Sequence, residues 1–295
     1  MFSLFYYKGR GNDLKILVEL LGGTIGSHKD GRGTVVLGRD MTDILPEGTD
    51  AVVRSPMTYS SENATAETYR EALKAITKDM EEICPEGVLI LHGTDTMAFF
   101  AQLAHRVLGG AVPVQIAGSI LPPDDPDSDY LKQITDGIRF LEKGESGVVC
   151  EGRSIPLDRV TSADISGRYG EHPDTFENFS GMDILEKRRR RFLSDEPLPK
   201  LLVIPAVPGA VIPGGGFDRV LIDCYHSGTA PVSLVPLIGK WTSEGIKVFL
   251  APIPSGGNTY ESLRELIGAG AIPLQSMPFE GAWAEAILLL SDGKE

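Results

Sequence analysis

The sequence predicts an α/β protein with two doubly wound domains, a larger N-terminal one and a smaller C-terminal one. Residues 87–91 form a continuous apolar run and residues 16–21 a mostly apolar one that includes Glu19, as in parallel strands that are buried on both faces. These runs alternate with helical patterns, which is the order expected of α/β folds. A chain of 295 residues can form more than one core. We place the first domain at residues 1–185, a linker at 186–199 and the second domain at 200–295.

The N-terminal half predicts its elements in a regular order. Thr65 is suited to cap a helix at its N-terminus, and Glu67 is suited to the first turn. A full capping box is not expected, because Thr68 occupies the position where the box has Glu or Gln. An edge strand is expected within residues 1–10. The further strands are expected at 16–21, 87–91, 111–117 and 147–150, and the helices at 66–83, 97–108 and 131–142.

The C-terminal half repeats this alternation after a polar segment at residues 181–200. That segment contains five consecutive basic residues, 187–191. We interpret the run as a solvated helix end or linker, with a nucleic-acid patch as the alternative. Strands are expected at 201–204, 219–224 and 246–252, and helices at 262–268 and 280–290.

The composition excludes several classes of partner. A formal net charge of −13 argues against nucleic acid and anionic membranes as main partners. No run approaches 18 apolar residues, and we expect no signal peptide in the first ten residues, whose apolar run is too short and too soon followed by charge. The cysteines Cys84, Cys150 and Cys224 lack metal-ligand spacing and are typical of a reducing, cytoplasmic compartment. We therefore expect no metal, and we expect no cofactor, because neither a P-loop nor a dinucleotide fingerprint is present.

The first candidate site follows the first buried strand. Two glycines, Gly22 and Gly23, end the strand and are followed at once by Thr24. Glycines permit positive φ or close backbone approach, and open α/β sheets bind ligands beyond the carboxyl ends of their strands. The alternative is a glycine turn that only ends a strand.

A second apolar strand ends in a similar polar turn, residues 92–97, with the sequence His-Gly-Thr-Asp-Thr-Met. Each turn alone is a weak signal. Together, in this order and about 70 residues apart by sequence number, the two motifs resemble those of the asparaginase/glutaminase family of amidohydrolases. The resemblance covers most of residues 14–290, although it is diffuse outside residues 21–97.

The resemblance implies hydrolysis of a side-chain amide, of asparagine or a related small molecule, to a carboxylate and ammonia. Thr24 would be the nucleophile, and Thr94 and Asp95 would support it, with Asp95 binding the substrate's α-amino group. Backbone N–H groups near Thr94 would stabilise the oxyanion, and Gly23 and Gly93 would lie against the substrate. The resemblance also implies self-association into a dimer or a tetramer.

Two positions near residue 60 bear on substrate choice. Aligned on the family pattern, Ser61 falls on a serine that binds the substrate carboxylate, and Glu62 falls on a usually neutral position. A negative charge there would repel an α-carboxylate. The alternative is a helix cap followed by a solvated loop. The family's lid loop supplies a tyrosine, whereas the polar loop at 28–34 is followed by no tyrosine before Tyr59.

Other departures concern the catalytic groups. Ser162 falls on the family's lysine, Thr229 on an asparagine and His226 on a glycine. Two hypotheses remain open. Either another base, such as His28, His92 or His226, serves a changed substrate, or the protein binds a ligand or has a regulatory role without efficient turnover.

Overall fold

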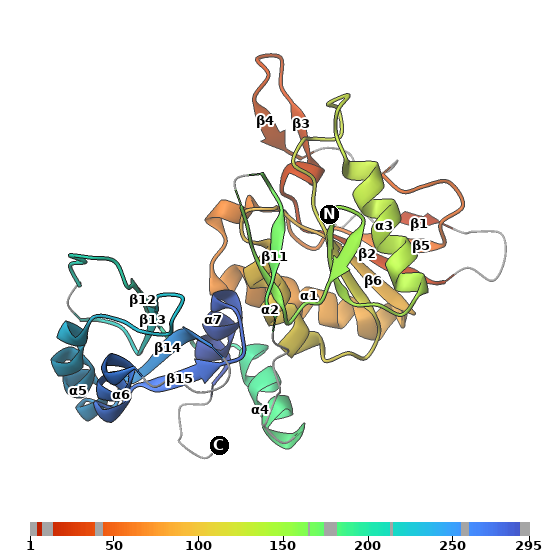
Figure 1. Ribbon diagram of the computed structural model, residues 1–295. Helices are drawn as coiled ribbons and strands as arrows, with labels where there is room; N and C mark the ends of the chain where they lie inside the picture. Colours follow the sequence, from red (N-terminus) through yellow and green to blue (C-terminus); the bar gives the residue numbers. More distant parts are fainter. Residues whose placement is uncertain are drawn as a thin grey trace. The chain divides into compact units, whose positions relative to one another are not determined.

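Figure 1 shows the computed structural model of the chain. The structure describes residues 5–7, 14–38, 44–164, 166–173, 182–212, 215–254 and 260–289. The chain divides into two compact units, Met1–Glu171 and His172–Glu295. Within the described ranges, no helix combines the length and the apolar character needed to cross a membrane.

Seven of the described strands of the first unit form one sheet in the order β1-β5-β2-β6-β7-β8-β9. The five central strands run parallel, and β1 and β9 pair antiparallel at the edges. Their bounds are Phe5–Tyr7 (β1), Ala51–Arg54 (β5), Ile16–Leu20 (β2), Gly87–Leu91 (β6), Val114–Ala117 (β7), Gly147–Cys150 (β8) and Arg153–Ile155 (β9). The edge strand predicted within residues 1–10 is present as β1, and the rest of that prediction lies outside the described residues.

Helices cover both faces of this sheet, which confirms the predicted α/β class (Figure 1). They are α1 (Ala66–Ile83), α2 (Met97–Leu108) and α3 (Tyr130–Glu142). Gly137 brings α3 onto the face that carries Leu89, since a Cβ atom there would lie 2.8 Å from the Leu89 side chain. Val18 belongs to the same cluster as α3. Its neighbour Glu19 therefore points to the opposite face, where it lies beside Asp79 of α1.

Helix α1 begins with a capping box that the sequence analysis did not expect. The Thr65 hydroxyl accepts a hydrogen bond from the Thr68 N–H at 3.2 Å, and the Thr65 N–H donates to the Thr68 hydroxyl at 3.1 Å. The expectation of an incomplete box was wrong, because a threonine hydroxyl at the third position reaches the cap residue as a glutamate carboxylate would.

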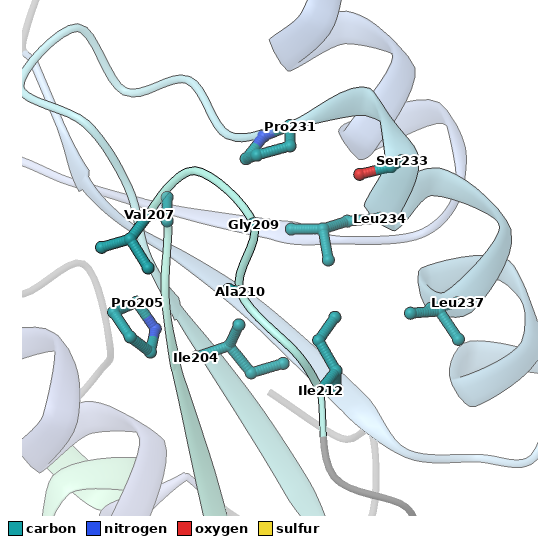
Figure 2. Close-up of a pocket in the computed structure, with 11 residues that line it drawn as sticks. Ile204, Pro205, Val207, Gly209, Ala210, Ile212, Pro231, Ser233, Leu234 and Leu237 are labelled. Carbon is teal, nitrogen blue, oxygen red and sulfur yellow. The ribbon is translucent and has the colours of Figure 1, made fainter.

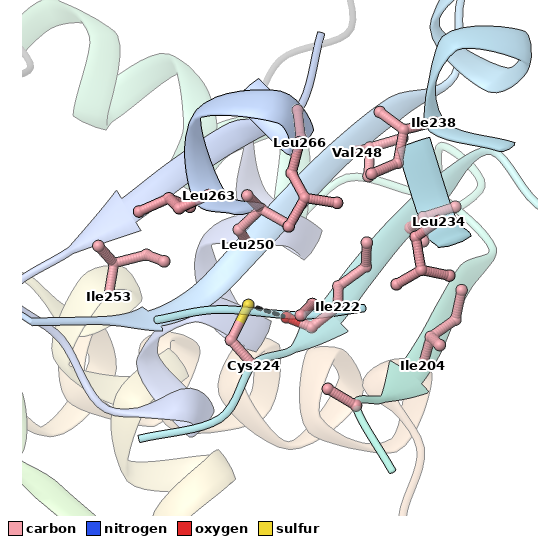
Figure 3. Close-up of a cluster of buried hydrophobic side chains, with 14 of the residues drawn as sticks. Ile204, Ile222, Cys224, Leu234, Ile238, Val248, Leu250, Ile253, Leu263 and Leu266 are labelled. Carbon is pink, nitrogen blue, oxygen red and sulfur yellow. Dashed lines mark hydrogen bonds between the residues drawn. The ribbon is translucent and has the colours of Figure 1, made fainter. Parts of the chain in front are cut away.

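The second unit is built on a parallel four-stranded sheet of described strands in the order β12-β13-β14-β15. The strands are Leu201–Pro205, Arg219–Asp223, Lys247–Ile253 and Ile272–Gln275. The helices are α5 (Val235–Ser243), α6 (Glu261–Gly268) and α7 (Phe279–Leu288). Figure 3 shows the core on the α5 and α6 side, where Ile222 and Leu250 lie among Ile238 and Leu266. The other face buries Leu221 and Phe249 with residues of α7.

The segment between the predicted domains contains helix α4 (Met182–Phe192), which packs on α7. Arg188 extends from α4 to Glu285 of α7, with 3.2 Å between its Nη1 and a carboxylate oxygen, and both side chains are buried. The neighbouring Arg190 pairs with Glu186 at 2.8 Å. The basic run therefore occupies the C-terminal part of a helix, where cations complement the helix dipole.

Glu19 is a fully buried carboxyl group in the middle of the first sheet. Burial is the main cause that raises its pKa from 4.5 to about 9, and the neighbouring carboxylate of Asp79 raises it further. Between these pH values the folded chain keeps a proton that the unfolded chain has released. The free energy of unfolding should therefore fall as the pH rises from about 5 to 9.

Replacing Glu19 by glutamine should remove this pH dependence. Glutamine cannot ionise, so Glu19→Gln should raise the free energy of unfolding by about 3 kcal/mol at pH 7 and flatten its decline between pH 5 and 9. Urea unfolding of both proteins at several pH values measures the two slopes. Glu82→Gln is the matched control. Glu82 is an exposed residue of α1, and its carboxylate pairs with Arg54 of β5. Parallel slopes in wild type and Glu19→Gln would contradict the argument.

Candidate active site

The two glycine turns meet at the point where the first sheet reverses its winding. After β2, the next strand of the sheet, β5, lies on one side of it, and the following strand, β6, lies on the other. In such sheets the ligand site is the crevice beyond the carboxyl ends of the two strands at the reversal. Leu20 pairs with Leu91, so β2 and β6 end at the same level. Residues 22–24 and 92–97 therefore leave the sheet side by side.

The backbones of the two turns touch through their glycines. Gly23 has φ 73° and ψ −171°. A Cβ atom on Gly23 would lie 2.1 Å from the Cα atom of Gly93, and one on Gly93 would lie 2.4 Å from the Ser61 hydroxyl. Both roles foreseen for glycine, positive φ and close approach, occur at Gly23. The structure thus brings together Gly23, Gly93 and Ser61, three of the predicted binding residues.

Thr24 opens a short 3-10 helix, Thr24–Gly26, directly beyond this contact. Thr24 is partly exposed, whereas Ile25 is fully buried and anchors the turn. The Ser27 hydroxyl donates to the Gly23 carbonyl at 2.8 Å and closes the turn from the other side. The threonine hydroxyl is therefore carried by a turn that its neighbours hold in place.

The loop predicted at 28–34 lies within a β-hairpin, formed by β3 (Ser27–Lys29) and β4 (Val35–Leu37). Asp30 organises its turn, because one carboxylate oxygen accepts from the N–H groups of Arg32 and Thr34 at 2.8 and 2.9 Å. The Lys29 N–H donates to Asp124 at 2.7 Å and ties the hairpin to the loop after β7. The hairpin contains no tyrosine, as the sequence shows.

His92, one of the three candidate bases, is fully buried. Its Nδ1 lies 2.7 Å from the Gly93 carbonyl oxygen, which can only accept, so Nδ1 carries the proton. Its Nε2 then accepts from the Tyr59 hydroxyl at 2.9 Å. Burial lowers the pKa of His92 to about 4, so the ring stays neutral. Both nitrogens are engaged, and His92 joins the second turn to the segment at residue 59.

The remaining residues of the second turn face different environments. Asp95 is exposed, and no ion pair to it occurs within the described ranges. The Thr96 hydroxyl donates to the carbonyl oxygen of buried Ser61 at 2.9 Å. Glu62, next to Ser61, is exposed. The carbonyl oxygen of Thr94 accepts a hydrogen bond from the Tyr169 hydroxyl at 2.7 Å, and no local sequence pattern predicts this contact.

Two predicted site residues lie away from these turns in the sequence. Ser162 is exposed on β10 (Val160–Ala163), which pairs with β11 (Tyr169–Glu171) in the first unit. Thr229 belongs to the second unit and follows β13. Its carbonyl oxygen accepts from the Tyr225 N–H at 2.9 Å, and its hydroxyl lies 3.0 Å from that of Ser227.

The second unit contains a pocket of about 390 Å³ at the carboxyl end of β12 (Figure 2). Its lining includes Ile204, Val207, Ile212, Leu234 and Leu237, and none of the described residues of the lining has an ionisable side chain. The predicted site residues are not part of this lining. Apart from the Ser233 hydroxyl, the described lining of the pocket is apolar.

Residues 15–179 match the family model of the N-terminal domain of asparaginase, which is more than half of the chain. The chain belongs to the asparaginase family. The L-asparaginase of Thermococcus kodakarensis is 25% identical over 315 residues, covering 96% of this chain and 94% of that protein. A glutamyl-tRNA(Gln) amidotransferase subunit of Methanosarcina barkeri is 34% identical over 298 residues, covering 88% of this chain and 70% of that protein.

Solved structures of asparaginase-family proteins share the fold. The thermostable L-asparaginase from Thermococcus kodakarensis superposes with a TM-score of 0.73 at 21% identity, covering 96% of this chain and 94% of that one. The probable cytoplasmic L-asparaginase from Campylobacter jejuni gives a TM-score of 0.70 at 16% identity, covering 95% and 96%. These structures show the shared fold, and the match to the family model confirms the family resemblance of the sequence.

Proposed function

We propose that this asparaginase-family protein hydrolyses a side-chain amide to a carboxylate and ammonia, with Thr24 as the nucleophile. The observation that carries the proposal is the contact of the two glycine turns at the winding reversal of the sheet, Gly23 against Gly93. The contact joins the turn that carries Thr24 to the turn that carries Thr94 and Asp95, at the edge where α/β sheets bind ligands.

The reaction divides into two acyl transfers. The Thr24 oxygen attacks the amide carbon while its proton passes to a base, and the tetrahedral oxyanion is stabilised by backbone N–H groups. The C–N bond then breaks, and the nitrogen leaves as ammonia after taking up that proton. Water attacks the resulting ester, which releases the carboxylate and restores the threonine. Asp95 would bind the substrate's amino group.

His28 is the base that we favour in the first unit. It follows Thr24 by four residues, on β3, and its Nδ1 is buried without a hydrogen-bond partner among the described residues. Imidazole is the usual proton acceptor near pH 7. This assignment replaces His92, whose two nitrogens are occupied.

An ammonia-release assay on asparagine, glutamine and short asparaginyl peptides tests the proposed function. We expect release from at least one of these amides. Purified, folded protein that released no ammonia from any of them would contradict the proposal and favour a ligand-binding or regulatory role.

Ser162 and Glu62 together predict the substrate class. A serine in place of the lysine removes a cation from the group of Thr94 and Asp95, and exposed Glu62 disfavours a free α-carboxylate. We therefore expect weak hydrolysis of free asparagine and preference for an amide within a peptide. Since acid–base assistance contributes about 10²–10⁴-fold, Ser162→Lys should raise asparagine hydrolysis by at least about tenfold.

The steady-state rate on free asparagine measures this change, with thermal unfolding as the check on folding. Arg159→Lys is the control, because it places a lysine just before the same strand without adding a charge. Wild type that hydrolysed free asparagine as fast as it hydrolyses asparaginyl peptides would refute the prediction.

The match to an amidotransferase polypeptide favours a second candidate function. A protein of that name belongs to a larger enzyme, so the amide of glutamine would be the substrate and another polypeptide the partner. Light scattering distinguishes the two candidates. The first predicts a dimer or a tetramer of this chain, and the second predicts a monomer that needs a different polypeptide. Ammonia release from glutamine but not from asparaginyl peptides would favour this second candidate.

A further inference from the structure

Three tyrosine hydroxyls hold alternate residues of the second turn. Tyr59 bonds to His92 at 2.9 Å, Tyr169 donates to the Thr94 carbonyl at 2.7 Å and Tyr69 donates to the Thr96 carbonyl at 3.3 Å. Burial raises the pKa of Tyr69 to about 12 and raises the pKa values of Tyr59 and Tyr169 well above the ordinary range. All three hydroxyls therefore remain protonated donors at neutral pH.

Tyr169 differs from the other two tyrosines because its hydroxyl bonds the Thr94 carbonyl. It lies buried on β11, paired with Ala163 of β10. The β10 strand is fixed in turn by α2, where the Gln102 amide donates to the Val160 carbonyl at 3.1 Å. The Tyr169 hydroxyl is thus held by a short sheet that packs on a helix, and it bonds the residue that the family resemblance places beside the nucleophile.

The bond to the Thr94 carbonyl sets the direction of the next N–H group. The peptide between Thr94 and Asp95 is trans, so its C=O and N–H point in opposite directions. The C=O points to buried Tyr169, and the Asp95 N–H therefore points away from it, on the side where the Asp95 side chain is exposed. No acceptor for this N–H occurs among the residues that the structure describes.

We propose that Tyr169 is a positioning residue that fixes the Thr94–Asp95 peptide, so that the Asp95 N–H donates to the substrate oxygen that gains negative charge. This inference rests on the proposed amide hydrolysis. It also gives a physical account of Ser162, which occupies the position where the family has a lysine. Ser162 brings no cation to the turn, and the neighbouring strand supplies a neutral hydroxyl that contributes orientation and no charge.

Removing the hydroxyl tests the proposal. Tyr169→Phe should lower kcat for ammonia release by roughly 10- to 100-fold, because a loosened donor loses part of the 10²–10³-fold that one oxyanion donor contributes. KM should stay within about twofold. The shape of the pH profile should not change, since the tyrosine transfers no proton. A raised KM with unchanged kcat, or an altered pH profile, would overturn the positioning role.

Tyr69→Phe is the matched control. It removes a buried hydroxyl that bonds the carbonyl oxygen of Thr96, two residues further along the same turn. Both variants should lose a similar amount of stability, about 1 kcal/mol, whereas kcat should fall markedly only in Tyr169→Phe. Equal losses of kcat in the two variants would mean that the hydroxyls stabilise the turn in general, and would refute a particular role at Thr94.

The inference can be separated from the proposed function. If wild-type protein releases no ammonia, the proposed function fails. Hydrogen exchange measured by mass spectrometry then reports on Tyr169 directly. Faster exchange of the peptide that contains residues 93–96 in Tyr169→Phe supports the orientation of the turn by this hydroxyl, and unchanged exchange overturns it.

Discussion

Replacing Thr24 by alanine should reduce ammonia release by at least about 10³-fold, on every amide that the wild type hydrolyses. The loss of an attacking oxygen removes the acyl-enzyme route and leaves only the binding and the backbone donors of the site. The fold should persist, because Thr24 is partly exposed and Ile25, which anchors the turn, is unchanged. Steady-state assays and circular dichroism of the same preparations measure both effects.

Two further variants make this result specific. Thr24→Ser keeps a hydroxyl and should retain measurable turnover. Thr34→Ala removes an exposed threonine of the neighbouring hairpin and should leave turnover unchanged. If Thr24→Ala released ammonia at near the wild-type rate, the nucleophile would have to be another residue, and the role of the first glycine turn would be only structural.

The parts of the fold that the sequence predicted well are those governed by local patterns. Helix α2 occupies the predicted residues 97–108, because its apolar positions recur at helical spacing between a polar turn and two glycines. The position of the first glycine turn beyond the carboxyl end of β2 also followed from sequence. The double role of Gly23 is the clearest case, because few residues other than glycine adopt its φ and ψ.

The parts that the sequence did not predict depend on contacts between distant residues. Helix α5 carries Pro236 and Gly239, which obscure a helical pattern, and its stability comes from burying Ile238 and Trp241. The bond from Tyr169 joins residues 75 positions apart and leaves no local signal. His92 was a candidate base because imidazole accepts protons near pH 7. Its complete burial depends on aromatic rings from three other segments, which the local sequence does not reveal.

Alanine at Gly23 should be the most damaging single-methyl change in the first unit. Gly23 has φ 73° and ψ −171°, a region of backbone conformation that is almost exclusive to glycine. The added Cβ would lie 2.1 Å from the Cα and 2.4 Å from the N atom of Gly93, and neither backbone atom can turn away as a side chain could. Backbone strain and this clash together should cost about 4 kcal/mol of the free energy of unfolding.

Gly26→Ala provides the control within the same turn. No atom lies within 4 Å of a Cβ atom built there, so its stability should change by less than about 0.5 kcal/mol. Urea unfolding measures the stability of both variants. The ammonia assay should show that turnover is lost in Gly23→Ala, because separating Gly23 from Gly93 also separates the turn of Thr24 from the turn of Thr94 and Asp95. Near wild-type stability of Gly23→Ala would mean that the two turns do not touch in solution, and would remove the contact on which the site is built.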